Sequence, residues 1–496
     1  MNYVELLSAA APETMVVLAA FAVLAVGLFA MRDVEPAIRR LIEVMIGCVG
    51  CTAAIGWMVA LPQHTDLLGG IFVVDSVIQV VKIALLTLTI LALLISQDSD
   101  FTKHVGEYFA LILMAAAGMM FLVSSEDILF IFVSLELTSL CLYVLAAFNK
   151  GQEQSAEAAI KYFLFGGMSA AFTLFGLSLL YGLAHSTNLA EIAVAVRSAG
   201  LDPLVVLGIV MTLVGFGFKV AAAPFHLWAP DVYQGAPLPS AAFIASGSKV
   251  AGFFITARVV STGFAGQLPN QALPAGWPVW ASLLAILAAV SMVLGNFAAI
   301  VQTRVRRLLA YSAIAHAGYM LLGVIAQGTP ATASLVYYVI TYALTTLGAF
   351  GVVAIVQQQT GDDRLTDFAG LARRSPGLAV CMMVFILSLA GIPPLAGFFG
   401  KFYIFSAVLQ GSAPGMKALW LVAMAVALSA VSLYYYLQVL KQIFVVPASA
   451  EKEIHFRTPL LQQVVLAVVA LTVIVLGCAP EWLIHRLTGV TAVAGL

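Results

Sequence analysis

Charged residues are scarce in this sequence. They make up 9% of its 496 residues, whereas hydrophobic residues make up 62%. A soluble domain is usually about 25% charged. So few charges cannot cover a globule of this size with a surface compatible with water, which excludes an ordinary soluble protein. The formal net charge of −1 also excludes the basic surface of a nucleic-acid-binding protein.

Cysteine is also rare, with five residues that all lie in apolar stretches. Cys48 and Cys51 form a C-x-x-C pair, a spacing that can serve redox chemistry or metal binding. The sequence offers no second pair and no βαβ context, so we interpret both as buried hydrophobic residues. It also lacks a cluster-binding cysteine set and a dinucleotide glycine fingerprint after a strand. We therefore expect no metal and no redox cofactor in this chain.

Long apolar runs dominate the sequence instead. A membrane-spanning helix needs about 20 apolar residues, and about fourteen segments qualify. They lie near 13–31, 41–61, 71–97, 105–123, 126–148, 157–184, 203–223, 236–260, 277–299, 307–327, 331–357, 377–409, 416–446 and 460–487. The first run lacks the positive flank that precedes a signal peptide's apolar core, so it is interpreted as a membrane helix. The pattern predicts an all-α polytopic membrane protein.

The basic residues predict its orientation. With fourteen spans and the N-terminus outside, the C-terminus is also outside. Loops predicted to be inside carry Arg32, Arg39, Arg40, Lys103, Lys150, Arg304, Arg306, Arg307, Arg364, Arg373, Arg374, Lys452 and Arg457. Loops predicted to be outside carry only Arg197, Lys417 and Arg486. This asymmetry agrees with the positive-inside rule.

Several ionisable residues fall within the predicted spans. They are Asp75, Lys82, Glu136, Lys161, Lys219, Lys249, Lys401, His226 and His316. An ionised side chain at mid-bilayer costs about 2.5–3.5 kcal/mol even on lenient insertion scales, so anchoring helices would avoid them. Burial destabilises a lysine ammonium and a nearby carboxylate stabilises it. Lysines placed between these influences can load and release a proton, which predicts a chain of protonatable sites.

Some of these residues have two interpretations. Glu136 and Lys161 could meet as an ion pair, but Glu157 lies one turn before Lys161 and could hold it as a surface pair. Asp75 and Lys82 are seven residues apart on one helical face and could form a relay or a packing pair. His316 lies ten residues after Arg306, about 15 Å along a helix. It could be a proton carrier or a satisfied core histidine.

Prolines interrupt two of the predicted spans. Pro224 frees the carbonyl of Val220, and the negative end of that half-helix would stabilise Lys219, with His226 just beyond as a possible relay. Pro393 and Pro394 similarly precede Lys401, freeing the carbonyls of Leu389 and Ala390. Lys249 lies among small residues that permit close helix packing.

One interrupted span in each half of the chain is a pointer to inverted repeats. The predicted units are residues 1–104 with helices 1–3, a first five-helix repeat at 105–262, a second at 275–446, and a last helix at 459–496. The two interrupted spans are the seventh and the twelfth. They are five spans apart, and this odd offset predicts opposite orientations in the membrane.

Taken together, these residues resemble a known family. Glu136, Lys219 with the sequence Pro224–Trp228, Lys249, the run Arg306–Tyr319 and the run Gly391–Lys401 are similar to the antiporter-like subunits of respiratory complex I. That family is related to Mrp-type sodium/proton antiporters and to membrane subunits of energy-converting hydrogenases. Of its three paralogous subunits, L is longer, M has glutamate at the position of Lys401, and N has lysine there. The chain resembles N.

The resemblance implies a function. Glu136 and Lys219 would form a proton-loading pair, Lys249 and His316 a central polar axis, and Lys401 the exit-side site. The chain would be a proton-translocating subunit of a bacterial NADH:quinone oxidoreductase in the inner membrane. FMN, iron–sulfur clusters and quinone would belong to partner subunits. The alternative is a subunit of an Mrp-type antiporter or of a membrane-bound hydrogenase.

Overall fold

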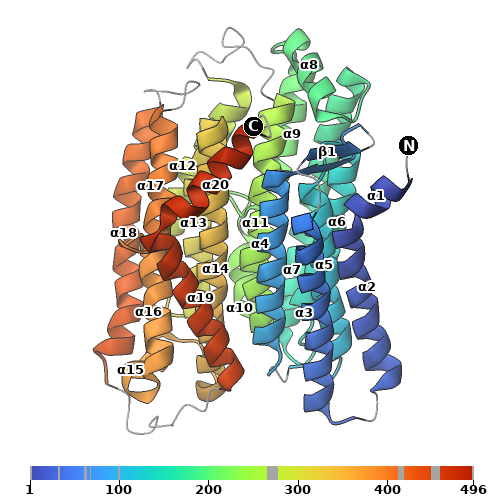
Figure 1. Cartoon of the computed structure of the whole chain (residues 1–496). Coiled ribbons are helices and arrows are strands. Elements are labelled where there is room, and N and C mark those ends of the chain that lie inside the picture. Colours follow the sequence, from blue (N-terminus) through green and yellow to red (C-terminus); the bar gives the residue numbers. More distant parts are fainter. Residues whose placement is uncertain are drawn as a thin grey trace.

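The computed structural model describes residues 3–31, 34–60, 64–67, 69–98, 101–264, 277–410, 418–447 and 459–493. It is a bundle of helices that run roughly side by side (Figure 1). A two-stranded β-hairpin and helix α8 lie at one end of the bundle, which we call the hairpin face. Helix α15 lies at the other end, which we call the α15 face. Both chain ends lie toward the hairpin face (Figure 1).

The first half of the chain contains α1 (Tyr3–Ala9), α2 (Ala11–Ala25), the π-helix η1 (Val26–Ala30), α3 (Pro36–Ala60), β1 (His64–Leu67), β2 (Phe72–Asp75), α4 (Ser76–Ser96), α5 (Val105–Val123), α6 (Ile128–Ala146), α7 (Glu153–Ala184), α8 (Leu189–Ala199), α9 (Pro203–Lys219), α10 (Trp228–Gly235), α11 (Leu238–Arg258) and the π-helix η2 (Val259–Phe264). The second half contains α12 (Val279–Ile300), α13 (Val305–Ala326), α14 (Thr329–Thr360), the 3₁₀-helix η4 (Leu365–Phe368), α15 (Leu371–Arg374), α16 (Pro376–Ala390), α17 (Ala396–Gln410), α18 (Leu419–Phe444), α19 (Leu460–Cys478) and α20 (Pro480–Val493).

Twelve helices in the described part of the chain are long and apolar enough to cross a membrane. Each of the fourteen predicted segments overlaps a helix, but two of them contain no helix of full length. The segment at 203–223 contains the shorter helix α9, and the segment at 377–409 is divided between the short helices α16 and α17. The structure therefore has twelve full-length candidates rather than fourteen. The chain is a multi-pass membrane protein.

The start of the third predicted span is a strand rather than a helix. β1 and β2 pair antiparallel, with His64 opposite Asp75. Branched valines at 73 and 74 favour the strand. Asp75 then begins α4 as its N-cap, because its carboxylate accepts a hydrogen bond of 2.6 Å from the backbone N–H of Ile78.

Both predicted helix breaks are present. α9 ends at Lys219, and a non-helical segment through Pro224 separates it from α10. α16 ends at Ala390, and α17 begins after the Pro393–Pro394 segment. α9 begins near the hairpin face and α16 begins beside α15, so the two broken spans run in opposite directions (Figure 1).

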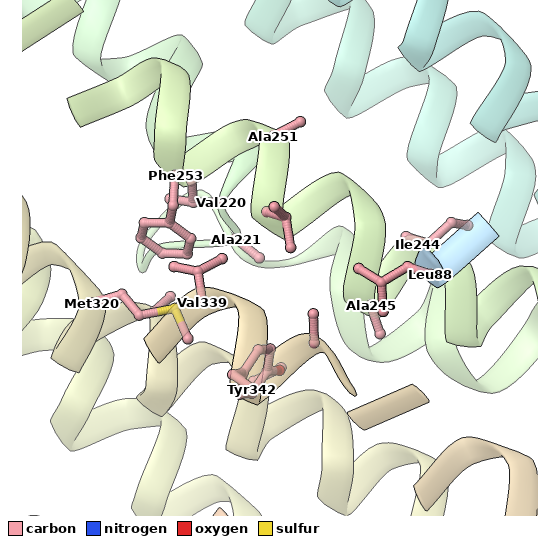
Figure 2. Close-up of a cluster of buried hydrophobic side chains, with 14 of the residues drawn as sticks. Leu88, Val220, Ala221, Ile244, Ala245, Ala251, Phe253, Met320, Val339 and Tyr342 are labelled. Carbon is pink, nitrogen blue, oxygen red and sulfur yellow. The ribbon is translucent and has the colours of Figure 1, made fainter. Parts of the chain in front are cut away.

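Apolar side chains fill the space between the two halves of the chain. Figure 2 shows Val220 and Ala221 of the first break beside α11, which supplies Ile244, Ala245, Ala251 and Phe253. Met320 of α13 and Val339 and Tyr342 of α14 face them from the second half. Because this packing excludes bulk water, every charged group inside it must find a local partner.

Asp75 and Lys82 each form an ion pair with a residue of another helix. Asp75 accepts a hydrogen bond of 3.1 Å from Nη1 of Arg258 at the end of α11. Lys82 forms an ion pair of 2.6 Å with Glu13 of α2, and both side chains are almost fully buried. Asp75 and Lys82 thus contribute to two separate ion pairs near the hairpin face.

Candidate functional site

Lys219 is the last residue of α9 and is only 3% exposed. Its Nζ atom donates a hydrogen bond of 3.0 Å to Oγ of Ser139 on α6. Glu136 lies one turn earlier on the same helix and interacts electrostatically with Lys219. The Oε1 atom of Glu136 has no hydrogen-bond partner among the described residues. Lys219 therefore lies beside the stretch of α6 that carries both Ser139 and Glu136.

Lys249 on α11 forms a hydrogen bond with a carbonyl group that the first break exposes. Its Nζ atom donates to the carbonyl oxygen of Val220 at 3.2 Å and to that of Ala313 on α13 at 2.8 Å. We expected the end of α9 to stabilise Lys219, whose own Nζ atom bonds Ser139 rather than a carbonyl of that helix end. Val220 is the C-cap of α9, and the partial negative charge at that helix end is directed at the lysine of a neighbouring helix instead.

Lys219 packs beside Gly252 on the helix that carries Lys249. A β-carbon added at Gly252, one turn after Lys249, would lie 3.4 Å from Cγ of Lys219. Lys249 is 1% exposed. Lys219 therefore packs against the helix that carries Lys249, close enough that a β-carbon at position 252 would touch it.

His316 continues the line into the second half. It lies on α13, is 2% exposed, and interacts electrostatically with both Lys249 and Lys401. Its ring lies 5.0 Å from the ring of Tyr342, measured between centroids. Nζ of Lys249 lies 5.9 Å from the same tyrosine ring. One aromatic ring therefore lies against both the lysine of the first half and the histidine of the second.

Lys401 on α17 is held by the second break. Its Nζ atom donates to the carbonyl oxygens of Leu389 and Ala390, each at 3.1 Å, and to Oγ of Ser429 at 2.8 Å. The residue after α16, Gly391, has a φ of +84°. A β-carbon there would lie 3.2 Å from Nζ of Lys401. The break exposes acceptors that satisfy a buried ammonium.

Lys401 also borders an open cavity. A pocket of about 360 Å³ is lined by Lys401, Ser429 and residues of the second break. Lys401 therefore lies at the end of the buried line that adjoins an opening.

Two predicted residues lie apart from this line. Lys161 does not pair with Glu136: its Nζ atom lies 2.7 Å from carboxylate oxygens of both Glu157 and Asp231. Its side chain is 37% exposed, because α7 places it at the rim of the bundle. His226 follows the first break and is partly buried, and its Nδ1 atom has no partner among the described residues.

The hydroxyl groups around these charges were not predicted from the sequence. Ser139 and Ser429 bind the two outer lysines, and Tyr338, Tyr342 and Tyr436 surround His316. One signal was available: Tyr338 and Tyr342 are four residues apart, so a helix places them on one face. A serine in a membrane helix gave no such signal, because it commonly bonds its own backbone.

The site and the fold identify the class of protein. Residues 125–431 match a family described as NADH:quinone oxidoreductase/Mrp antiporter, TM, and the chain belongs to this family. Two relatives of this chain are named as subunit N of NADH-quinone oxidoreductase. NADH-quinone oxidoreductase subunit N 2 of Acidobacterium capsulatum is 49% identical over 495 residues, which cover 98% of this chain and 99% of that protein. Subunit N of Moorella thermoacetica is 38% identical and covers 92% and 94%.

Solved structures show the same fold. A chain of respiratory complex I from Thermus thermophilus with bound aureothin matches with a TM-score of 0.77 and 32% identity, covering 96% of this chain and 99% of that one. A chain of the Mrp complex from a Dietzia species matches with a TM-score of 0.79, covering 98% of this chain and 97% of that one. At 19% identity the second likeness shows the fold alone.

Proposed function

We propose that this chain is the proton-translocating membrane subunit of an NADH:quinone oxidoreductase and belongs to its N type. Electron transfer from NADH to quinone takes place in partner subunits, which hold FMN, iron–sulfur clusters and the quinone. The chain contributes a proton path through Glu136, Lys219, Lys249, His316 and Lys401. Lys161 and His226 stand beside this path, at the rim of the bundle and just beyond the first break.

One observation carries the proposal. Three lysines and a histidine are each at most 5% exposed, lie on four different helices, and are held by backbone carbonyls or hydroxyl groups. The carbonyls at two helix breaks bind Lys249 and Lys401. Irregular backbone inside a bilayer is tolerated where it is buried in protein or lines a wet cavity. Such breaks, each aimed at a titratable lysine, fit a transport path better than a scaffold.

The chemistry of the line favours protons over metal cations. Its members are three amines, an imidazole and one carboxylate, Glu136. Amines and imidazoles gain and lose protons, whereas a sodium or calcium ion is held by several oxygen ligands. Cationic groups in a row would repel a second cation but can pass a proton by alternating which of them is charged.

The distribution of basic residues supports an orientation in the bacterial inner membrane. Arg304, Arg307, Arg364 and Arg373 lie at or beside the α15 face, where α13 begins and α15 lies. Arg197 and Arg486 lie on helices at the other end. By the positive-inside rule, the α15 face is cytoplasmic and both termini are on the periplasmic side.

The two broken spans support the inverted repeats. They occupy the fourth place among the long helices of residues 105–262 and 275–446, and they run in opposite directions. We therefore keep these boundaries as two repeats. The long helices α2, α3 and α4 precede them within 1–104, and the predicted last helix at 459–496 is divided into α19 and α20.

The experiment uses the whole complex that contains this chain, reconstituted into vesicles, with Lys249→Met. Methionine keeps the length of the side chain and removes its charge and protons. We expect proton translocation to fall to about a tenth or less while the complex still assembles. Lys441→Met, at an exposed position near the end of α18, is the matched control and should pump normally. Unchanged proton translocation in an assembled Lys249→Met complex would refute the proposal.

A further inference from the structure

His316 is held between hydroxyl groups of two different helices. Its Nδ1 atom lies 2.7 Å from Oη of Tyr338 on α14, and its Nε2 atom lies 3.2 Å from Oη of Tyr436 on α18. Tyr436 in turn forms a hydrogen bond with Oγ of Ser312 on α13. All four side chains are at most 2% exposed.

We propose that Ser312, Tyr436 and Tyr338 are further proton-transfer residues, and that His316 is the junction between two hydroxyl branches. One branch runs from His316 through Tyr436 to Ser312. The other runs through Tyr338 toward Lys401. This inference rests on the proposed function, because it concerns how protons reach and leave the buried line.

The first branch points toward the α15 face. α13 starts at that face with Val305, whose backbone N–H is bonded to the carbonyl of Asp363. Ser312 precedes His316 by four residues, so it lies about 6 Å closer to that face along the helix. Tyr436 lies eight residues before the end of α18, about 12 Å from it. The carbonyl of Gln442, near that end, bonds the N–H of Gly370 beside α15.

The second branch reaches Tyr338, whose ring packs beside Lys401. A β-carbon added at Gly400, the residue before Lys401, would lie 2.4 Å from the ring of Tyr338. The tyrosine ring therefore packs directly on the segment that carries the lysine. Tyr338 thus contacts His316 with its hydroxyl and the Lys401 segment with its ring.

The transfer needs no tyrosinate. A neutral imidazole has one N–H donor and one bare acceptor nitrogen. When Nε2 accepts the proton of the Tyr436 hydroxyl, Tyr436 takes a proton from Ser312, and Ser312 takes one from a water molecule on the side of the α15 face. Nδ1–H gives its proton to the Tyr338 oxygen, which releases its own proton through a water molecule to the neutral amine of Lys401. Each group gains one proton and loses one. The passage reverses the hydroxyl orientations and moves the N–H of His316 from Nδ1 to Nε2, and both changes reset before the next passage.

The neighbouring tyrosines offer matched controls. Tyr435 directs its hydroxyl to Asn296 at 3.1 Å, and Tyr337 directs its own to the carbonyl of Leu476 at 2.8 Å. Both are as buried as Tyr436 and Tyr338, and each loses one hydrogen bond when changed to phenylalanine. Tyr338 also makes one such bond, to His316, so Tyr337 is its direct match, whereas Tyr436 makes two, to His316 and to Ser312.

The experiment compares Tyr436→Phe and Tyr338→Phe with Tyr435→Phe and Tyr337→Phe in the reconstituted complex. Protons moved per NADH oxidised and the solvent deuterium isotope effect on turnover are measured. We expect proton translocation to fall to about a tenth or less in the first two variants, with a raised isotope effect, and to stay within about twofold in the controls. Ser312→Ala should follow the first group, and Ser312→Thr, which keeps the hydroxyl, should restore translocation.

The outcomes separate the two proposals. If Lys249→Met blocks translocation but Tyr436→Phe and Tyr338→Phe pump like their controls, the hydroxyl branches are wrong and the lysine path stands. If Lys249→Met itself pumps normally, the proposed function fails. An equal loss in all four tyrosine variants would show a packing role and overturn this inference. Should Tyr436→Phe fail to assemble, the Ser312→Ala and Ser312→Thr pair decides, since equal translocation in both would contradict the branch.

Discussion

The ammonium group of Lys249 donates a hydrogen bond of 3.2 Å to the carbonyl oxygen of Val220, across the break that follows α9. The end of α9 is thereby bonded to a lysine of α11. A shift of the segment between α9 and α10 would change the number of acceptors around Lys249. It would also move Lys219, which directly precedes Val220. The break thus offers a mechanical link between two neighbouring members of the line.

Removing the first lysine of the line should interrupt transport without unfolding the chain. Lys219→Ala deletes the group that bonds Ser139 and balances Glu136. We expect proton translocation and the coupled quinone reduction to fall about tenfold or more, with assembled complex still present in the membrane. Lys150→Ala, in an exposed turn, should leave both unchanged. Normal translocation by an assembled Lys219→Ala complex would show that Lys219 carries no proton.

A single β-carbon at the second break should have a similar effect. Gly391 has a φ of +84°, where a non-glycine residue costs about 1–2 kcal/mol, and its added β-carbon would lie 3.2 Å from Nζ of Lys401. We expect Gly391→Ala to lower both thermal stability and proton translocation. Gly377→Ala has no atom within 4 Å of the new β-carbon and serves as the control. Equal behaviour of the two variants would argue against a role for the shape of this break.

Much of the fold could be predicted because lipid imposes simple rules. Long apolar runs gave the positions of the helices, and the prolines at 224, 393 and 394 gave both breaks. The buried site could be predicted because a charged group deep in an apolar span has a high free-energy cost. This argument pointed to Lys219, Lys249, His316 and Lys401. These residues are buried in the structure as expected.

The pairings could not be predicted because they depend on which helices touch. Glu136 and Lys161 lie on consecutive spans, yet α7 turns Lys161 toward Asp231 of α10 instead. The carbonyl of Val220 lies one residue after Lys219, but a backbone group cannot be assigned to a side chain of another helix from sequence alone. The hairpin was missed because an apolar run of four residues does not distinguish a strand from the start of a helix.

The ion pair between Glu13 and Lys82 should matter for stability and not for transport. Both groups are buried, their atoms are 2.6 Å apart, and they lie outside the proposed line. Lys82→Met leaves a buried carboxylate without its partner, which costs about 3–5 kcal/mol. Lys82→Met combined with Glu13→Gln removes both charges and should recover much of this loss.

The measurement is the half-life of the purified complex at elevated temperature, together with protons moved per NADH oxidised at a lower temperature. The double variant should survive longer than Lys82→Met alone, and the proton ratio should stay at the wild-type value in both. A double variant that is no more stable than the single one, or a lowered proton ratio, would contradict this assignment.

Arg258 should anchor the helix that carries Lys249. Its guanidinium group bonds Asp75 at 3.1 Å and Glu126 at 2.6 Å, so the end of α11 is fixed both to the start of α4 and to the turn between α5 and α6. Arg258→Ala leaves two carboxylates without their cation, and we expect a loss of about 3–5 kcal/mol. Arg258→Lys keeps the charge but lacks the planar fork that reaches two acceptors, so its loss should be smaller, about 1–3 kcal/mol.

Arg373→Ala, on the exposed surface of α15, is the control for a lost arginine. If the complex with Arg258→Lys loses activity on heating as fast as the complex with Arg258→Ala, the stabilisation depends on the planar geometry of the guanidinium group. If the complex with Arg258→Lys loses activity only as fast as the wild type, charge alone suffices. Only equal half-lives for Arg258→Ala and Arg373→Ala would show that this contact does not anchor α11.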